Sequence, residues 1–533
     1  MKIKYDYAPM KADKLIILFP FYVLLLGIYP VLFALGHNIH EVYASVALRP
    51  LLLFFGFSLA LLLVFFLVTK DWIKAGLLSS YTLLLFFSYG KLLTFTKTLP
   101  WLLPLARHAV FIPLYAVIAI IGLYFIAKAK PSLQVQNVLT WFSIFLIAFP
   151  LFQIARYSIE TARQQQQSRQ ASVETSFLNL PENPPDVYVI VLDSYPRADI
   201  VESVYQVDNS KFLGDLSALG FTTVPCSRSN YAYTELSLAS MFNMDYLDVL
   251  AADVLAAGND TLPLFNLLKH SQMRTNLEAL GYTSYSIVSY PPLAWEDADV
   301  FISTEINDIP KGKSLGTLNS FERMVYYGTA LRILLDSDLI FSNATSLPAN
   351  YPYEEHLLQH QYTLDSLRSV AAQRGPKLVF SHITSPHAPF VFYPDGSLIE
   401  NPPVLPWQGD LPHDEHIKYF GMQIEYIDSA IYPVLETILN ESETEPIIIL
   451  FGDHGYGSDE KRMPVLSSIY FSPNHRESIP KDLSLVNTFR LMFNLYFSGE
   501  YEILPNLSYM SPHSTPYQFT LMEEISPNCA DLE

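Results

Sequence analysis

The sequence predicts a protein of two parts: an α-helical membrane domain, followed by an α/β domain with a mostly parallel central sheet between helices. Two patterns predict this organisation. Before residue 160 the chain carries apolar stretches as long as a membrane-spanning helix requires. Later, short β-branched runs alternate with helical patterns, which is typical of a parallel sheet covered by helices. We expect the membrane domain at 1–158, a connecting helix and linker at 159–185, and the α/β domain at 186–533.

Five apolar segments have about the 20 residues that a helix needs to cross a bilayer. They cover about 14–36, 46–69, 72–95, 107–127 and 137–157. The run LLLFFGFSLALLLVFFLV at 51–68 is apolar on every face, whereas a helix on the surface of a soluble protein is apolar on one face only. No small-residue cleavage site follows the first segment, so we expect a permanent span there and not a signal peptide.

The basic residues predict how the spans are oriented. Lysines crowd the N-terminus and every second loop, at Lys2, Lys4, Lys11, Lys14, Lys70, Lys74, Lys128 and Lys130. The opposite loops hold fewer basic residues, namely Arg49, Lys91, Lys97 and Arg107. Because loops rich in lysine and arginine stay in the cytoplasm, we expect a cytoplasmic N-terminus and, after five spans, an extracytoplasmic α/β domain in the cell (plasma or inner) membrane.

The charge and the cysteine content exclude several classes of protein. The formal net charge is -19, and most acidic residues lie after the apolar segments. Such a domain repels nucleic acid, and no lysine- or arginine-rich stretch offsets this. Only Cys226 and Cys529 are present, which excludes a disulfide scaffold and a multi-thiolate metal site. One bridge between them can form in an oxidising compartment, and the sequence does not decide whether it does.

The α/β domain is predicted from alternating strand and helix patterns. The strand patterns cover 186–195, 221–225, 282–289, 377–385, 446–455 and 467–473. The helical patterns cover about 207–219, 234–249, 262–279, 353–374 and 415–440. In open parallel sheets, ligands bind beyond the carboxyl ends of the strands, so the residues that follow each strand are the candidates for chemistry.

Three predicted strands end in residues that can bind a metal ion. Asp193 ends the first strand, Asp453 and His454 follow the strand near 447–451, and His382 and His387 lie at the end of the strand near 377–381. Carboxylate oxygens and imidazole nitrogens are typical metal ligands. Each residue also has a structural explanation, since an aspartate can cap the next helix and His387 can be a turn residue. The three strand ends together favour a functional site.

Thr234 is the candidate nucleophile. It opens the predicted helix 234–249, where unpaired backbone N–H groups and the helix dipole favour a phosphate or sulfate group. A metal ion would lower the pKa of the hydroxyl group and activate it. The alternative is that Thr234 only caps the helix.

These motifs together resemble the alkaline phosphatase/sulfatase superfamily. They are Asp193 after a buried strand, Thr234 in T-x-x-S-L-x-S-x-F, His382 and His387 before proline, and G-D-H-G at 452–455. Within the superfamily the chain is most similar to the membrane-bound group of lipoteichoic acid synthase and lipid A phosphoethanolamine transferase. That group has the same plan of five spans, a connecting helix and an extracellular sulfatase-like domain.

The resemblance implies a role for each of these residues. Thr234 would be the nucleophile and become a phospho-threonine. Asp193, in the place of a metal-binding glutamate, would bind one divalent metal ion together with Asp453, His454 and Thr234. His387, with His382, would bind the substrate phosphate or protonate the leaving group. The mixed ligands favour zinc or manganese over calcium, which prefers oxygen ligands alone.

The sequence departs from this pattern at several positions. It lacks the C/S-x-P-S-R motif of formylglycine sulfatases, and Ser194 stands where their second strand-end aspartate would lie. The transferases usually carry another histidine after G-D-H-G, but this chain has only Lys461 and Arg462 there. These departures disfavour a formylglycine sulfatase, and the segment 456–466 directly after G-D-H-G offers no histidine as an acid for the leaving group or as part of an acceptor site.

Three hypotheses for the function follow. The first is transfer of a phospho-alcohol head group, phosphoglycerol or phosphoethanolamine, from a membrane phospholipid to an envelope glycan or lipid acceptor. The second is hydrolysis of phosphate or sulfate esters by the same first step. The third is a catalytically inactive envelope protein with a structural or regulatory role, which the intact motif residues argue against. A transporter is disfavoured because the spans hold almost no charged residues.

Overall fold

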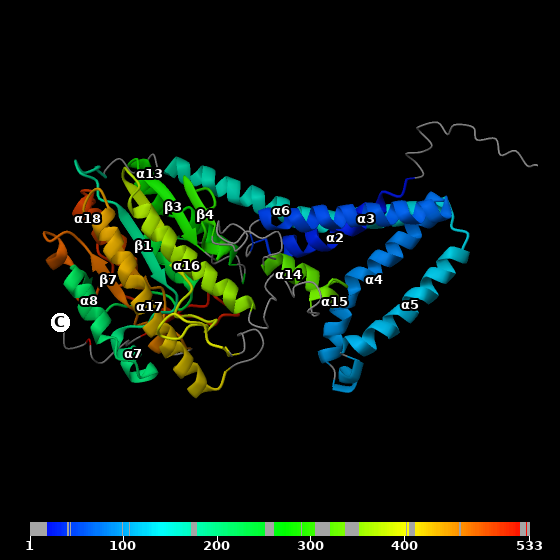
Figure 1. Cartoon of the computed structure of the whole chain (residues 1–533). Helices are drawn as coiled ribbons and strands as arrows, with labels where there is room; N and C mark the ends of the chain where they lie inside the picture. Colours follow the sequence, from blue (N-terminus) through cyan, green and yellow to red (C-terminus); the bar gives the residue numbers. More distant parts are fainter. Residues whose placement is uncertain are drawn as a thin grey trace, which may run out of the picture. The chain divides into compact units, whose positions relative to one another are not determined.

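A computed structural model of the chain describes residues 19–39, 42, 44–98, 100–105, 107–171, 178–250, 259, 261–288, 290–303, 320–335, 351–400, 402–403, 411–457, 460–522 and 529. The chain divides into two compact units (Figure 1). We call residues 1–160 and 316–347 the helical unit, and residues 161–315 and 348–533 the sheet unit. The four N-terminal lysines and residues 14–18 of the first predicted span lie outside the described residues.

The helical unit contains long apolar helices in the order that the sequence predicts. They are α2 (Tyr22–His37), α3 (Leu48–Thr69), α4 (Trp72–Thr98), α5 (His108–Lys128) and α6 (Leu133–Ala171), with short 3-10 helices η1 (Ala44–Ala47) and η2 (Pro100–Leu105) between them. Among the described residues, four stretches are long and apolar enough to cross a membrane, namely Ala44–Thr69, Trp72–Thr96, His108–Lys128 and Leu133–Ile159. The helix α2 is described over 16 residues only, so the structure supports four of the five predicted spans.

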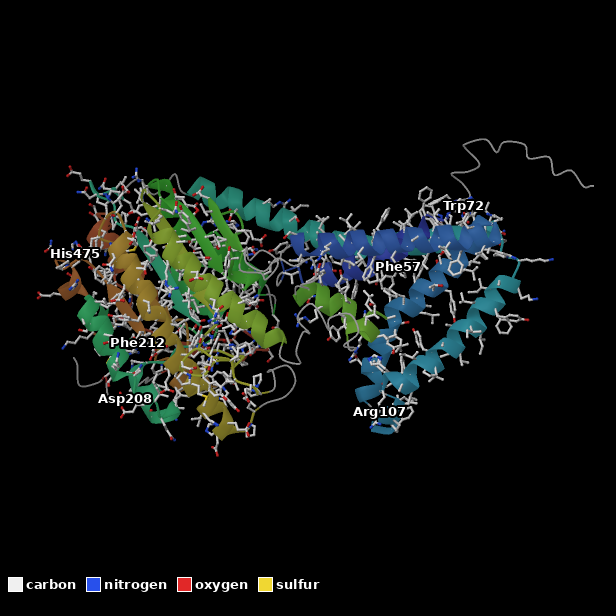
Figure 2. The ribbon with its side chains drawn as sticks, in the orientation of Figure 1. Phe57, Trp72, Arg107, Asp208, Phe212 and His475 are labelled. Carbon is white, nitrogen blue, oxygen red and sulfur yellow. A yellow bond between two sulfur atoms is a disulfide. The ribbon has the colours of Figure 1, made fainter. Side chains whose placement is uncertain are left out.

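The outer surfaces of these helices are apolar. Leu67 of α3 is 63% exposed and Ile120 of α5 is 67% exposed. Carbon atoms make up most of the side chains drawn along these helices in Figure 2. Apolar surface of this extent is unfavourable in water and suits the hydrocarbon region of a bilayer.

A segment from the later part of the chain also belongs to the helical unit. It contains α14 (Ser320–Tyr327) and α15 (Arg332–Leu335). Glu322 of α14 is 1% exposed and pairs with Arg49 at the start of α3. The backbone N–H of Ala330 donates a hydrogen bond to the carbonyl of Phe86, at 2.8 Å. The sequence analysis placed this segment inside the α/β domain, whereas its contacts are with α3 and α4.

The sheet unit contains a mostly parallel seven-stranded sheet, as predicted. The strand order is β2-β7-β6-β1-β5-β3-β4. The strands are β1 (Val187–Leu192), β2 (Thr222–Thr223), β3 (Thr283–Val288), β4 (Val300–Ser303), β5 (Lys377–Ile383), β6 (Ile447–Gly452) and β7 (Ser467–Tyr470). The strand β7 runs antiparallel to β2 and β6, and the other pairs are parallel. The strand β4 was not predicted. In the central three strands Leu192 lies opposite Ile383 and Gly452, so their carboxyl ends are aligned.

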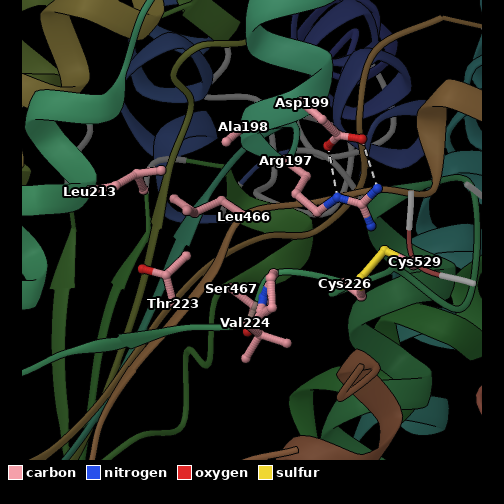
Figure 3. A pocket seen from close by; sticks show the side chains of 11 residues that line it. Arg197, Ala198, Asp199, Leu213, Thr223, Val224, Cys226, Leu466, Ser467 and Cys529 are labelled. Atoms are coloured by element: carbon pink, nitrogen blue, oxygen red, sulfur yellow. Dashed lines mark hydrogen bonds and ion pairs between the residues drawn. A yellow bond between two sulfur atoms is a disulfide. The ribbon is translucent and has the colours of Figure 1, made fainter. Parts of the chain in front are cut away.

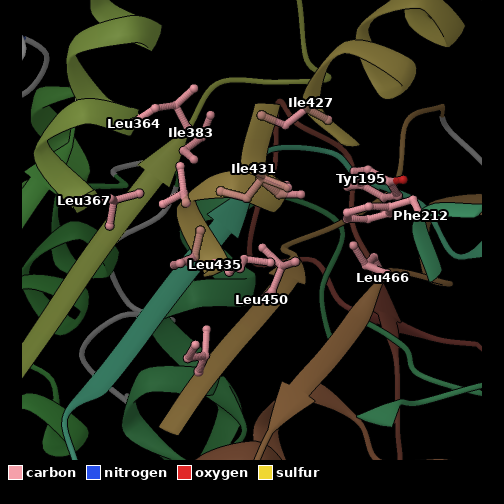
Figure 4. Packing of buried hydrophobic residues seen from close by; sticks show 14 of the residues in the cluster. Tyr195, Phe212, Leu364, Leu367, Ile383, Ile427, Ile431, Leu435, Leu450 and Leu466 are labelled. Atoms are coloured by element: carbon pink, nitrogen blue, oxygen red, sulfur yellow. The ribbon is translucent and has the colours of Figure 1, made fainter. Parts of the chain in front are cut away.

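Helices cover both faces of this sheet because alternate residues of each strand point to opposite faces. Ile190 and Leu450 face a core formed with α7 (Ala198–Tyr205), α8 (Ser210–Leu219), α16 (Tyr351–Ala371) and α17 (His413–Glu441) (Figure 4). On the other face, Phe242 lies 5.2 Å from Phe380 and 5.7 Å from Phe489 between ring centroids. That layer contains α9 (Thr234–Asn243), α12 (Leu262–Lys269), α13 (Gln272–Ala279) and α18 (Leu485–Tyr496). The helix α18 was not predicted.

Short elements and one disulfide complete the sheet unit. The short elements are α10 (Leu247–Leu250), η4 (Pro291–Leu293), η6 (Glu460–Arg462), η7 (Arg476–Ser478), β8 (Tyr509–Met510) and β9 (Thr520–Leu521). Cys226 and Cys529 form the disulfide, with their Cα atoms 5.8 Å apart. The bridge joins positions 303 residues apart and ties the C-terminal segment to the loop before α9.

The packing predicts a strict requirement for glycine at position 452. A Cβ atom there would lie 2.1 Å from the carbonyl oxygen of Tyr195, closer than non-bonded atoms can approach. We therefore expect Gly452→Ala to lower the Tm of the detergent-purified protein by about 5 °C or more, measured by thermal unfolding. Gly214→Ala is the control, since no atom lies within 4 Å of the added carbon. Equal Tm values for the two variants would contradict this packing.

A second prediction concerns pH. Tyr195 donates a hydrogen bond to Asp428 at 2.6 Å, and burial raises the pKa of Asp428 from 3.8 to about 8. The folded chain therefore binds more protons than the unfolded chain between these values, so the free energy of unfolding falls as pH rises through this window. We expect Asp428→Asn, which cannot ionise, to gain stability relative to the natural chain between pH 5 and pH 8. Tm curves that stay parallel over this range would contradict the prediction.

Candidate metal and nucleophile site

Three side chains meet beyond the aligned ends of the central strands. Asp193 follows β1, Asp453 follows β6, and His382 is the penultimate residue of β5. All three are buried, and one ligand atom from each lies within 4.8 Å of the others. The N–H of Asp193 donates to the carbonyl of Ile383 at 3.0 Å, which continues the pairing of β1 with β5 beyond the last strand residue. The sheet thus places these groups together.

Thr234 and His454 lie beside this group. The Thr234 Oγ1 atom is 3.1 Å from Nε2 of His454, and that nitrogen is 3.5 Å from Oδ2 of Asp453. Ser237, one turn further along α9, donates a hydrogen bond to the carbonyl of Asp453 at 2.7 Å. Thr234 is the first residue of α9, and Tyr233 holds the N-cap position without a side-chain cap bond. The structure therefore brings Thr234 together with Asp193, His382, Asp453 and His454.

The donors present fit a divalent metal ion. Oδ1 of Asp453 accepts hydrogen bonds from the backbone N–H groups of Ser194 and His454, at 2.9 and 3.0 Å. Its Oδ2 atom is buried and has no hydrogen-bond partner among the described residues. Both ring nitrogens of His382 are likewise buried and have no hydrogen-bond partner among the described residues. Buried polar atoms without partners are costly, and a cation bound between them would satisfy them.

His382 lies beside the carboxylates of Asp193 and Asp453, whereas its expected role was in contact with the substrate. The resemblance assigned it to the substrate phosphate or the leaving group. In the structure its Nε2 atom lies 3.8 Å from Oδ2 of Asp193, and the side chain is 1% exposed. The geometry thus adds His382 to the possible metal ligands.

Ser194 holds two of the ligands in place, which the sequence analysis did not foresee. Its backbone has φ 65°, in the left-handed region. Its hydroxyl group donates to Oδ1 of Asp193 at 3.0 Å and lies 3.3 Å from Nδ1 of His454. Ser194 therefore orients Asp193 and His454.

The protonation states suit metal binding. Burial by itself would raise the pKa of Asp193, but His387, His382 and His454 outweigh it and hold that pKa below its ordinary value. Burial lowers the pKa of His454. An ionised carboxylate and a neutral imidazole are the forms that bind a metal ion.

His387 lies next to this group. Its backbone N–H donates to the carbonyl of Asp193 at 3.2 Å, and its Nδ1 atom lies 2.8 Å from the carbonyl of Ala388. Nε2 is then the nitrogen that can exchange a proton with a ligand. Two further histidines, His356 of α16 and His416 of α17, lie within electrostatic range of His387. The sequence analysis missed both, because a helix pattern alone does not show which helical residues face a strand end.

Two charged residues flank Thr234. Burial raises the pKa of Glu235, the next residue along α9. Arg462 of η6 brings its Nη2 atom to 3.5 Å from Nε2 of His454. The sequence analysis named Arg462 without a role, and it did not single out Glu235.

The cavity beside the disulfide is separate from this site (Figure 3). It has a volume of about 420 Å³, and its lining includes Arg197, Thr223, Cys226 and Cys529. The guanidinium group of Arg197 pairs with Asp199 at 2.8 Å, so its charge is already neutralised. None of the residues that line this cavity is a predicted site residue.

Comparison with known proteins gives matches among solved structures only. No family model and no curated protein matches the sequence. The C-terminal periplasmic domain of EcEptC from Escherichia coli matches at 11% identity and a TM-score of 0.38, over 66% of this chain and 95% of that chain.

An integral membrane protein is also among the matches. The integral membrane protein lipooligosaccharide phosphoethanolamine transferase A from Neisseria meningitidis matches at 12% identity and a TM-score of 0.38, over 89% of this chain and 95% of that chain. The putative sulfatase yidJ from Bacteroides fragilis matches at 12% identity and 0.36, over 63% and 82%. The solved structures to which this chain is similar thus include phosphoethanolamine transferases and a putative sulfatase.

Proposed function

We propose that this protein is a metal-dependent transferase of the cell envelope. It moves a phospho-alcohol head group, phosphoglycerol or phosphoethanolamine, from a membrane phospholipid to an envelope glycan or lipid. The observation that carries the proposal is the position of Thr234. Its hydroxyl oxygen lies 3.1 Å from His454 at the N-terminus of a helix, beside buried carboxylates, in a chain with four apolar helices.

The reaction has two half-reactions. In the first, the Thr234 oxygen attacks phosphorus and an O–P bond forms. The P–O bond to diacylglycerol breaks, and its oxygen gains a proton while Thr234 has lost one. In the second, a hydroxyl group of the acceptor attacks the same phosphorus, loses its proton and forms a new O–P bond. The bond from phosphorus to the Thr234 oxygen breaks, and that oxygen regains a proton. In this proposal His387 supplies the proton to the leaving group through Nε2, since Nδ1 is the nitrogen that lies beside the carbonyl of Ala388.

Asp193, Asp453, His454 and Thr234 would hold the metal ion, with His382 beside them. A bound zinc or manganese ion would lower the pKa of the Thr234 hydroxyl group and neutralise charge that develops on phosphorus. Ser194 keeps Asp193 and His454 oriented, and the N-terminal amides of α9 face the substrate anion.

The location follows from two features. The four apolar helices favour an integral membrane protein. The Cys226–Cys529 disulfide favours an oxidising compartment for the sheet unit, since cytoplasmic proteins rarely keep such bridges. With the lysine distribution of the sequence, this supports a cytoplasmic N-terminus and an extracytoplasmic catalytic domain.

Hydrolysis of phosphate or sulfate esters is the second candidate. It shares the first half-reaction and differs only in the acceptor, which would be water. The four apolar helices favour transfer, because they keep the site in a chain anchored at the donor lipid.

The nucleophile can be tested directly. We expect peptide mass spectrometry of protein incubated with phosphatidylglycerol and phosphatidylethanolamine to find a head-group adduct on Thr234, and the adduct identifies the donor. Thr234→Ala should carry none and lose diacylglycerol release. Thr437→Ala is the matched control, since the Thr437 hydroxyl group donates a hydrogen bond to the carbonyl of Pro433 in its own helix. An unmodified Thr234 in protein that holds its metal and turns over no lipid would refute the proposal.

Removal of the metal gives an independent test. We expect a chelator to abolish diacylglycerol release, and zinc or manganese to restore it. Asp453→Asn should reduce the bound metal measured by elemental analysis, because it removes a buried ligand oxygen. Asp395→Asn, in an exposed turn with Ser397, should leave the metal content unchanged. Full turnover by metal-free protein would contradict the proposed metal site.

A further inference from the structure

Arg462 is held rigidly beside the nucleophile. Its Nε atom donates to the carbonyl of Ala232, two residues before Thr234. Its Nη1 atom donates to the carbonyl of Gly457 at 2.8 Å. The guanidinium carbon lies 4.8 Å from the ring centroid of Tyr233, so the group rests on an aromatic face. These contacts fix the plane of the guanidinium group without a carboxylate partner.

The remaining nitrogen of Arg462 points to the reaction centre. Nη2 lies 3.5 Å from Nε2 of His454, the same atom that lies 3.1 Å from the Thr234 oxygen. Among the described side chains, no ion pair joins this guanidinium group to a carboxylate, although Asp193, Glu235 and Asp453 lie within electrostatic range of it. The Nε and Nη1 donors of Arg462 are used by backbone carbonyl groups, and Nη2 is directed at the site. An anion bound beside Thr234 would accept a hydrogen bond from Nη2.

We propose that Arg462 is a further catalytic residue, whose guanidinium group binds a non-bridging oxygen of the phosphoryl group that Thr234 attacks. The inference rests on the proposed phosphoryl transfer and deepens it. It also fits the chemistry, because a planar guanidinium group matches the geometry of phosphate oxygens. In phosphoryl transfer the negative charge spreads over the non-bridging oxygens in the transition state, where a fixed cation stabilises it most.

The transferases that the motifs resemble usually carry a histidine after G-D-H-G, and the role of Arg462 differs from the role of such a histidine. An arginine side chain does not release its proton at physiological pH, so Arg462 cannot act as the acid for the leaving group. It acts by charge and by hydrogen bonding. The proton for the leaving group is then left to another residue, and the effect of Arg462 should not depend on how basic that leaving group is.

The test compares the natural full-length protein, loaded with metal, with Arg462→Gln. Isothermal titration with inorganic phosphate measures anion binding without turnover, and we expect the variant to bind phosphate about 10-fold or more weakly. With soluble aryl phosphodiesters, kcat/KM should fall about 100-fold. The fall should be equal for good and poor leaving groups. Arg462→Lys, which keeps the charge but loses the fork geometry, should lie between the two proteins in both measurements.

Arg490→Gln is the matched control. Arg490 also donates to two carbonyl groups, those of Met244 and Glu502, but it does not contact the candidate site. We expect it to keep the natural phosphate affinity. Tm and metal content, measured for every variant, separate a lost contact from a lost fold, and Arg462→Lys serves if Arg462→Gln does not fold.

Two outcomes would overturn the role of Arg462. One is equal phosphate affinity in the natural protein and in a folded Arg462 variant, including no binding in either. The other is a loss of rate that grows as the leaving group becomes more basic, which would assign Arg462 to proton supply. The transferase proposal fails separately, if Thr234 takes up no head group from phospholipid although phosphate binding depends on Arg462.

Discussion

The candidate site depends on one hydrogen-bonded carboxylate. Asp453 accepts the N–H of Ser194 on one oxygen, which ties the end of β6 to the turn after β1. Its own carbonyl accepts the hydroxyl group of Ser237, which ties the same strand end to α9. The ends of two strands and the helix that carries Thr234 are thus fixed to one residue that is fully buried. A change at Asp453 would disturb geometry and charge together.

The parallel sheet explains why so many charged and polar groups can meet in a buried place. Because β5, β1 and β6 run in the same direction with aligned registers, their last residues open onto one edge. The apolar layers on both faces exclude water along the strands and end where the strands end. The desolvation that this imposes on Asp193 and Asp453 is unfavourable unless positive charge is near. Histidine, arginine and a metal ion are the available sources of that charge.

The sequence predicts the parts of this site that depend on strand ends. Asp193, His382 and Asp453 each follow or end an apolar run, and parallel strands bring such positions together, so their proximity could be inferred. The parts that depend on tertiary contacts could not be. Ser194 acts through a backbone turn and through bonds to residues about 260 positions away. Arg462 reaches His454 from a short 3-10 helix whose direction no periodic pattern indicates. The strand β4 has four residues, and α14 packs with helices that precede it by more than 200 residues.

The segment with α14 changes how the protein can be divided. The chain passes between its two units three times, after residues 160, 315 and 347. The buried side chains Phe321, Val325 and Tyr326 pack with Val31, Leu35 and Phe54 of the apolar helices. A fragment that begins at residue 186 would keep this segment but lose the apolar helices against which it packs. It would then expose an aggregation-prone apolar surface to water. A soluble form of the sheet unit therefore requires excision of the segment 316–347 as well as removal of the N-terminal helices.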